Sequence, residues 1–248
     1  MRHQIVLISL LAACIGLTIW ITGMDKIGVM TPFTPGVMWR ETQRHLQMVF
    51  ITELIVIPIG VPLGILVTRP GFRKLATPII GAANAGQSIP SMAIVAIMVP
   101  ILSGLGFKAF GLLPAIIALS IWGLLPILRN TYAGINSIDP AIVEAARGMG
   151  MTRGQIALRI ELPLALPVIM TGIRISTVVV VGTATLAALI AAGGLGRIIL
   201  AGVFSSEEWI ILQGVAPTAA LAITLGAILE FIERRLTPRG LKVKAQIG

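Results

Sequence analysis

The side chains that most often carry out chemistry in proteins are scarce in this sequence and lie far apart along it. His3 and His45 fall near the ends of apolar runs, and Cys14, the single cysteine, lies inside one. Nucleophilic catalysis and metal binding both need several such groups close together. Because the sequence has no Ser/His, Cys/His or metal-ligand cluster, we expect no catalytic, cofactor-binding or metal-binding residue on this chain, and a membrane-bound enzyme is disfavoured.

A segment rich in charged residues interrupts the apolar sequence between residues 137 and 163 and has strong local signals. Asp139 can accept hydrogen bonds from free backbone N–H groups, and Pro140 fits the first position of a helix. These two residues predict a short helix over residues 140–147.

A turn and a second helix should follow. Gly148 and Gly150 can both adopt the left-handed conformation that closes a helix. Thr152 with Gln155 three residues later matches a capping box, and Pro163 should end the helix that begins there. The segment is therefore predicted to be a helix-turn-helix outside the bilayer.

The first helix of this segment has small and adaptable side chains on one face. Ala141, Ile142, Ala145, Ala146 and Met149 recur at spacings of three and four. Small side chains let a partner's backbone approach closely, and methionine adapts to an irregular groove. From spacing alone, docking of a partner and folding back onto the chain's own helix ends are equally open.

The elements that must position this segment are membrane-spanning helices. The composition is 56% hydrophobic and 12% charged, with a mean hydropathy of +0.97, whereas soluble proteins have roughly 25% charged residues. Crossing ~30 Å of hydrocarbon takes about 20 apolar residues. We predict an all-α integral membrane protein with about six transmembrane helices, near residues 4–22, 46–67, 77–102, 111–128, 166–190 and 209–232.

The positions of lysine and arginine predict the orientation, because cytoplasmic flanks carry the excess of these residues. Most of the 19 lie in the second connection, the fourth connection and the C-terminal tail. Both termini and the 137–163 segment should therefore be cytoplasmic. Without an aromatic-rich basic surface, the net charge of +9 does not indicate nucleic-acid binding.

The first apolar run has a second interpretation. Leu11, Ala12, Ala13 and Cys14 are similar to a lipoprotein cleavage box after a short basic start. Because the run continues past Cys14 through Trp20, which is too long for a signal core, a retained first helix is favoured.

The charged segment also carries the full pattern of a known family. Glu144-Ala145-Ala146 is followed after three residues by Gly150, after nine more by Ile160, and then by Leu162-Pro163. This arrangement is similar to the EAA loop of permease subunits of bacterial ABC importers, which forms coupling helices that sit in a cleft of the ATP-hydrolysing subunit. The resemblance implies coupling roles for these residues: Glu144, Ala145, Ala146, Gly148 and Gly150, with Arg147 and Met149 as further contacts.

The resemblance also implies a fold and a set of partners. It predicts an N-terminal helix and external loop over residues 1–45, a five-helix methionine-importer-like type I permease core over 46–232, and a basic cytoplasmic tail over 233–248. Such a permease lies in the bacterial inner membrane, among membrane lipid, and works with cytoplasmic ABC ATPase subunits and a second permease chain of the same or related sequence. ATP and Mg²⁺ are expected on the ATPase, because this chain has no Walker-type motif.

Five other segments look like permeases for osmoprotectants such as glycine betaine, carnitine or choline. They lie at residues 89–91, 114–119, 125–132, 182–187 and 193–196. Since the sequence ends at Gly248 without room for a fused binding domain, a separate periplasmic or tethered binding protein is expected. A permease for another small solute, such as an amino acid, is the alternative.

Two polar faces within the spans are candidates to line the translocation path, since polar groups in a membrane are costly unless they face water or one another. At about 100° per residue, one face lies on the third span and one on the fifth. Their residues are Asn84, Gln87, Ser88 and Ser91 on the third span, and Thr171, Arg174, Gly182 and Thr185 on the fifth. Helix packing by Ser, Thr and Gly is the competing explanation.

Arg174 is a charge inside a predicted span and needs a partner or water. Its side chain can extend to the cytoplasmic interface. Asp139, Glu144 and Glu161 are its candidate partners on that side.

Glu53 is the second charge within a predicted span. It can meet a substrate cation, or it can pair with Arg44 or Arg40 near the outer surface, which is favoured at this shallow depth. A carrier driven by an ion gradient is less favoured than an importer, because only Glu53 is well placed for ion coupling and the two halves show no evident inverted repeat.

Overall fold

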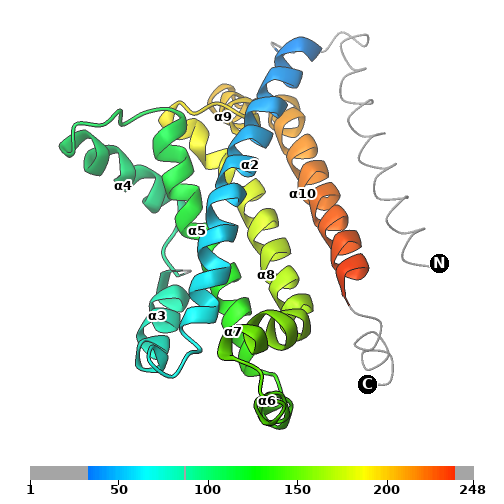
Figure 1. Cartoon of the computed structure of the whole chain (residues 1–248). Helices are drawn as coiled ribbons and strands as arrows, with labels where there is room; N and C mark the ends of the chain where they lie inside the picture. The colour runs from blue at the N-terminus through cyan, green and yellow to red at the C-terminus, as the bar shows by residue number, and fades with distance from the viewer. Residues whose placement is uncertain (1–32, 87, 238–248) are drawn as a thin grey trace. The chain divides into compact units, whose positions relative to one another are not determined.

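The structure is a computed structural model and describes residues 33–86 and 88–237. All regular elements in these residues are helical (Figure 1). They are α2 (Pro35–Leu66), α3 (Arg73–Gly86), α4 (Ser91–Gly104), α5 (Leu112–Asn136), α6 (Pro140–Gly148), α7 (Arg153–Ile156), the π-helical turn η2 (Ala157–Glu161), α8 (Leu162–Thr183), the 3₁₀ helix η3 (Ala184–Ile190), α9 (Leu195–Ser205) and α10 (Glu208–Leu236).

Four of the described helical segments are long and apolar enough to cross a membrane. They are α2, α5, the continuous segment Arg153–Ile190, and α10. The pair α3 and α4 adds a fifth if it is counted as one broken span. The predicted first span, near residues 4–22, lies outside the described residues.

The second predicted span begins earlier than expected, at Pro35 instead of residue 46. Hydropathy hides its first turns because they contain several charged and polar residues. Glu41 and His45 are nevertheless buried, and Glu41 accepts a hydrogen bond from Gly194 N and pairs with Arg197. A buried helix can therefore include polar residues when their hydrogen-bonding groups have partners, even where the hydropathy of the sequence predicts that the span has ended. The predicted boundaries at 45/46 and 232/233 fall inside α2 and α10.

The third predicted span is not one helix. α3 ends at Gly86, and α4 begins at Ser91 with Pro90 as its N-cap at φ −56° and ψ 128°. Proline has no N–H to donate and disfavours helical geometry in the residue before it, here Ile89. The proposal of one polar helical face over Asn84, Gln87, Ser88 and Ser91 is therefore wrong.

The fifth predicted span also changes form before its end. α8 passes into η3 after Thr183, and η3 closes at Ala191 in the left-handed conformation, with φ 58°. A further helix that the sequence did not predict, α9, follows Gly194, whose φ is 82°. Gly194 suits this place because a side chain there would be strained and would meet Met48 Cε at 2.8 Å.

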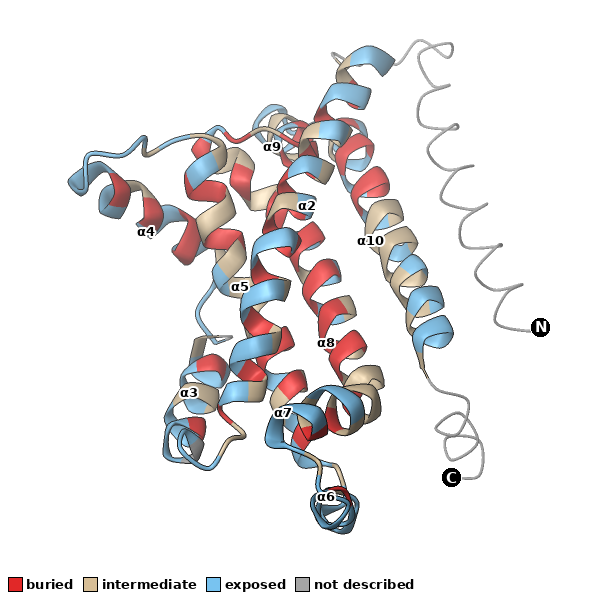
Figure 2. Cartoon of the chain, in the orientation of Figure 1, coloured by how far each residue is buried: buried red, intermediate tan, exposed pale blue. Residues whose placement is uncertain are grey.

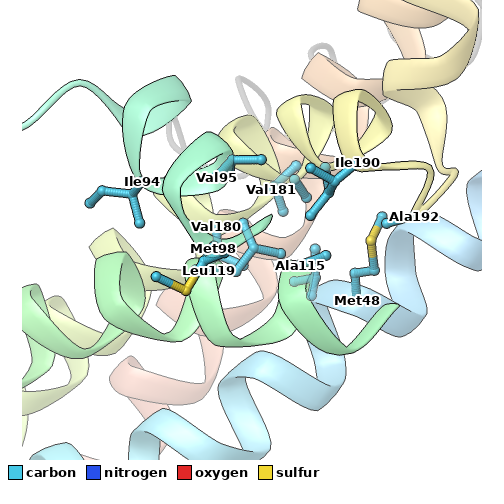
Figure 3. Close-up of a cluster of buried hydrophobic side chains, with 14 residues drawn as sticks. Met48, Ile94, Val95, Met98, Ala115, Leu119, Val180, Val181, Ile190 and Ala192 are labelled. Carbon is cyan, nitrogen blue, oxygen red and sulfur yellow. The ribbon is translucent and has the colours of Figure 1, made fainter. Parts of the chain in front are cut away.

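The described residues form two compact units. The first contains the chain up to Ile55, with Ile89–Gly123 and Thr177–Ala227. Its main core cluster joins side chains of α2, α4, α5, α8 and η3, including Met48, Met98, Leu119 and Val181 (Figure 3). A smaller cluster joins Met38 with Leu195, Ile198 and Ile210.

The second unit contains Val56–Ser88, Leu124–Ser176 and the chain from Ile228 onward. Its core includes Val56, Ile127, Ile169 and Ile173. Close helix packing supports this core, because a Cβ added at Gly172 would lie 2.7 Å from Asn130 Cβ. This unit carries the predicted helix-turn-helix.

Candidate functional site

The hairpin formed by α6 and α7, called the α6–α7 hairpin here, begins as the sequence predicts. Asp139 Oδ1 accepts a hydrogen bond from Ala141 N at 2.9 Å, and Pro140 occupies the first turn of α6. Thr152 and Gln155 form the reciprocal capping box at the start of α7: Thr152 N donates to Gln155 Oε1 at 2.8 Å and Gln155 N donates to Thr152 Oγ1 at 3.3 Å. Both predicted helix starts are confirmed.

The turn between the two helices depends on one of the two predicted glycines. Gly150 has φ +80°, in the left-handed region. Gly148 is the last residue of α6 and keeps a negative φ, so only Gly150 uses the left-handed conformation that either glycine could adopt. Gly150 N donates to Arg147 O at 2.9 Å and Met151 N to Ala146 O at 3.2 Å, which satisfies carbonyls that the end of the helix would otherwise leave free.

Most of α6 faces outward (Figure 2). Met149 is 73% exposed and Ile142 43% exposed. Of the seven predicted coupling residues, six are exposed: Glu144, Ala145, Arg147, Gly148, Met149 and Gly150. Ala146 is only 1% exposed, so its predicted place on the contact face is wrong. Its small side chain is instead buried within the second unit. The outer side of α6 is therefore free for a partner, while the side with Ala146 packs against the chain itself.

The second helix does not end at Pro163 as predicted. The helix continues from α7 through the π turn η2 into α8, and Pro163 is the second residue of α8. In η2, Leu162 N donates to Ala157 O, five residues back. Such π turns occur often at functional sites, and here the wider turn lets the helix pass the proline without a break.

An ion pair fixes η2 to the segment after α2. One guanidinium nitrogen of Arg69 lies 2.6 Å from Glu161 Oε2, and the side chains are 30% and 10% exposed. Taking charges out of water is costly, and close pairing offsets that cost. The pair therefore holds the base of the α6–α7 hairpin against the end of α2 within the second unit.

Arg174, in α8, pairs with α10. Its Nη1 lies 3.4 Å from Glu230 Oε2 and 3.9 Å from Glu233 Oε2. Glu230 also pairs with Arg234 one turn further along α10. These ion pairs supply the partner that an intramembrane arginine requires.

The partners predicted for Arg174 are therefore wrong. Asp139 caps α6, Glu144 is exposed on that helix, and Glu161 pairs with Arg69. The only sequence signal for the actual partners is that Glu230 and Glu233 stand three residues apart at the end of an apolar run.

The remaining predicted path residues of the fifth span do not share one regular face. Thr171 Oγ1 donates to Pro167 O at 3.0 Å, and Thr185 Oγ1 donates to Gly182 O at 2.7 Å. Thr185 lies in η3, where each residue turns the chain by about 120°. The α-helical spacing of about 100° per residue therefore does not place Thr185 on the same face as Thr171 and Arg174. Gly182 is exposed, and a Cβ added there would meet nothing within 4 Å.

Two further predicted residues lie at the break in the third span. Asn84 is exposed near the end of α3, and Ser91 is half-buried at the first position of α4. Ser88 is exposed between them, and Gln87 lies outside the described residues. The polar groups thus line a helix break, where backbone groups also need solvent or partners.

Glu53 is 8% exposed within α2. Its predicted pairing with Arg44 or Arg40 is wrong, because nine residues of helix place Arg44 about 13 Å away along the axis and on the opposite side. Arg44 instead donates to Ala192 O and to Gln47 Oε1. Within residues 33–86 and 88–237, no three His, Cys, Asp or Glu side chains are grouped to hold a metal ion.

Comparison with known families places most of the chain in one of them. The family described as "Binding-protein-dependent transport system inner membrane component" matches residues 60–241.

Curated relatives match over most of the chain. The choline transport system permease protein OpuBB of Bacillus subtilis is 41% identical over 207 residues, which cover 84% of this chain and 92% of the relative. The osmoprotectant import permease protein OsmW of Salmonella typhimurium is 40% identical over 219 residues, which cover 88% of this chain and 100% of the relative.

Solved structures share the fold. An inward-facing structure of the MetNI methionine ABC transporter matches with a TM-score of 0.74 and 27% identity, over 83% of this chain and 100% of the matched chain. An amino acid ABC transporter matches in fold with a TM-score of 0.65 at 20% identity, over 80% of this chain and 93% of the other. These matches confirm the predicted all-α, methionine-importer-like permease fold.

Proposed function

The chain belongs to the family of binding-protein-dependent transport system inner membrane components, and from this premise we propose that it is the permease subunit of an ATP-driven importer for an osmoprotectant. Glycine betaine, carnitine and choline are the solutes proposed. The observation that carries this solute class is the identity of about 40% to permeases named for osmoprotectants, choline and carnitine, over 79% or more of this chain.

The α6–α7 hairpin is proposed as the contact with a cytoplasmic ABC ATPase. Its exposed turn offers small residues and one adaptable apolar side chain, Met149, to a partner groove. Ala146 is assigned to the inner packing of the hairpin instead of the contact. ATP and Mg²⁺ would bind to the ATPase, and this permease would hold neither.

The route from the hairpin to the membrane is proposed to be the helix that runs from α7 through η2 into α8. Movement of the hairpin on ATP binding would shift α8, and alternating access would follow. In this proposal a second permease chain and a separate binding protein complete the importer, and both termini lie in the cytoplasm.

The polar groups at the break between α3 and α4, together with Thr171, Gly182 and Thr185, are proposed to border the path of the solute. Their support is chemical: polar side chains in a membrane protein gather where water or a solute passes. Asn84→Leu should impair uptake while assembly of the transporter is unchanged, and normal uptake would remove Asn84 from the path.

Reconstitution tests the function directly. The purified permease, its ATPase and its binding protein would be placed in liposomes, and uptake of labelled glycine betaine, carnitine, choline and methionine would be measured with and without ATP. We expect ATP-dependent uptake of at least one quaternary ammonium solute and none of methionine. An ATPase variant unable to hydrolyse ATP is the control.

Two outcomes would contradict the proposal. Uptake of methionine alone would retain an importer but change its solute class. Uptake that persists without the ATPase and stops when the ion gradient is removed would indicate a secondary carrier.

A further inference from the structure

The first unit contains a cavity of about 660 Å³ beside the N-terminal turns of α2. It is bordered by α2, by the end of η3 and by the start of α9. Its charged lining residues are Arg40, Glu41, Arg44 and Arg197, and its remaining lining residues are small.

The single acidic group of the cavity is already engaged. Glu41 Oε2 accepts from Gly194 N at 2.8 Å, and Glu41 Oε1 lies 2.7 Å from Arg197 Nη1. Glu41 is 8% exposed. Its charge therefore neutralises Arg197 and leaves the other two arginines of the cavity uncompensated.

Neither of those two arginines is paired with an acidic side chain among the residues that the structure describes. Arg44 donates to Ala192 O at 3.2 Å and to Gln47 Oε1 at 3.1 Å, which are both neutral acceptors. Arg40 is exposed and has neither an ion pair nor a hydrogen bond to any residue that the structure describes. Two arginines that line one cavity match an oxyanion, because guanidinium binds phosphate or carboxylate through paired hydrogen bonds.

The backbone of the cavity is unusual. Ala191 has φ 58° and Gly193 has φ +83°. Left-handed geometry is costly for alanine, and such residues gather at ligand sites. A Cβ at Gly193 would lie 3.3 Å from Arg44 Cγ, so the glycine lets the loop lie against the Arg44 side chain. Ala192 belongs to the core cluster together with Met48, which anchors the loop (Figure 3).

The depth of the cavity indicates which anion it meets. α2 has 32 residues, or about 48 Å, which exceeds the ~30 Å hydrocarbon layer. Part of α2 must therefore lie outside the hydrocarbon layer. The charged side chains of its first turns and the 63% exposed Trp39, a typical interfacial residue, indicate that these turns lie at the level of the lipid headgroups. Leu54 and Ile55 are 62% and 38% exposed and lie within about 60° of Arg40 around the helix.

We propose that this cavity binds the phosphate group of an anionic membrane phospholipid. Arg40 and Arg44 donate to the phosphate oxygens, and an acyl chain follows the apolar surface of Leu54 and Ile55. A lipid uses both the charged cavity and the apolar surface beneath it, whereas a free anion or an acidic protein segment would use the arginines alone.

Native mass spectrometry of the assembled transporter in detergent tests the proposal. The probes are phosphatidylglycerol, phosphatidylcholine with the same acyl chains, and sn-glycerol 3-phosphate. Arg40→Gln/Arg44→Gln is the test variant, Arg40→Lys/Arg44→Lys keeps the charge, and Lys108→Gln removes one exposed charge outside the cavity.

The expected result is a phosphatidylglycerol molecule bound more tightly than phosphatidylcholine. Its affinity should fall about fivefold for each arginine replaced by glutamine, or about 25-fold in the double variant. The lysine pair should retain most of the affinity, and Lys108→Gln should retain all of it. Equal thermal midpoints of the variants establish that they are folded.

Three outcomes would overturn the proposal. The first is an unchanged phosphatidylglycerol affinity in the double glutamine variant. The second is equal binding of sn-glycerol 3-phosphate and the lipid, which would indicate a site for a free anion. The third is a double variant that loses affinity for the binding protein while lipid binding is unchanged, which would indicate a docking surface for an acidic protein.

Discussion

Replacement of Glu161 by glutamine should destabilise the second unit and weaken coupling to ATP hydrolysis. The Glu161 carboxylate lies 2.6 Å from the Arg69 guanidinium. Loss of one member of a buried ion pair costs about 3–5 kcal/mol, because the other charge is left without a partner. Since the Arg69 side chain is 30% exposed, water can solvate part of it, and we expect a loss of about 2–3 kcal/mol in the free energy of unfolding.

The exposure of the two side chains predicts an asymmetry between the single variants. Arg69→Gln leaves a carboxylate that is only 10% exposed and should therefore cost more, about 3–4 kcal/mol. The double variant leaves no unpaired charge, so it should be more stable than the sum of the two losses predicts. Glu207→Gln, at an exposed carboxylate of the first unit, is the control and should change stability by less than about 0.5 kcal/mol.

Two measurements test the role of the Arg69–Glu161 ion pair. Unfolding in mixed detergent micelles, monitored by circular dichroism, gives the free energies of unfolding of the unaltered protein, the two single variants, the double variant and the Glu207→Gln control. In the reconstituted importer, the number of ATP molecules hydrolysed per solute imported should rise in Glu161→Gln, because the hairpin is no longer held at its base. A stability loss without change in this ratio would limit the pair to a structural role, and additive losses in the double variant would refute the ion-pair argument itself.

Four other substitutions, one of them a control, test local features of the second unit. Gly150→Ala should cost about 1–2 kcal/mol, because its φ is +80°, while the helical Gly148→Ala should be neutral or stabilising; equal hydrogen-exchange rates of the hairpin in both variants would contradict this. Gly172→Ala should lower the unfolding free energy by about 1–3 kcal/mol, since its Cβ would lie 2.7 Å from Asn130 Cβ, and an unchanged denaturation midpoint would argue against tight packing. Asp139→Ala should cost about 1 kcal/mol, seen as faster exchange of the first amides of α6 but not of α7.

The features predicted correctly from sequence depend on few neighbouring residues. Asp139 and Thr152 cap their helices through hydrogen bonds that span two or three residues. Gly150 closes α6 because one left-handed residue is needed there. The same rule could not decide between Gly148 and Gly150, since either glycine can adopt the conformation and the register of the turn decides which one does.

The features missed from sequence depend on residues far apart in the chain. The Glu41–Arg197 ion pair joins residues separated by 156 positions, and nothing in the local sequence around either residue indicates it. The depth of Arg174 predicts partners near the hairpin, whereas the partners lie in α10. Charge and depth predicted that Arg174 needs a partner, but only the packing of helices decides which partner it has.

The breaks and continuities of the long helices also differ from those predicted, and two prolines explain the differences. Pro90 stands where α4 begins and contributes to the break in the third span. Pro163 was expected to break a helix and does not, because it lies at the second position of α8, directly after the π turn η2. A proline is tolerated where its missing N–H has no carbonyl waiting for it, and the sequence alone does not reveal the wider turn that creates this condition.

The continuity at Pro163 determines how a force on the α6–α7 hairpin would reach the membrane. A helix broken at this residue would act as a hinge and absorb a displacement of the hairpin. In the structure, the backbone is helical from Arg153 to Thr183 with η2 as its wider turn, and the Arg69–Glu161 ion pair holds that turn from the side. A displacement at the exposed tip would therefore reach the part of α8 that lies in the second unit, residues 162–176. η2 has the poorest helical geometry of this segment, so a substitution there should most easily uncouple that part of α8 from the hairpin.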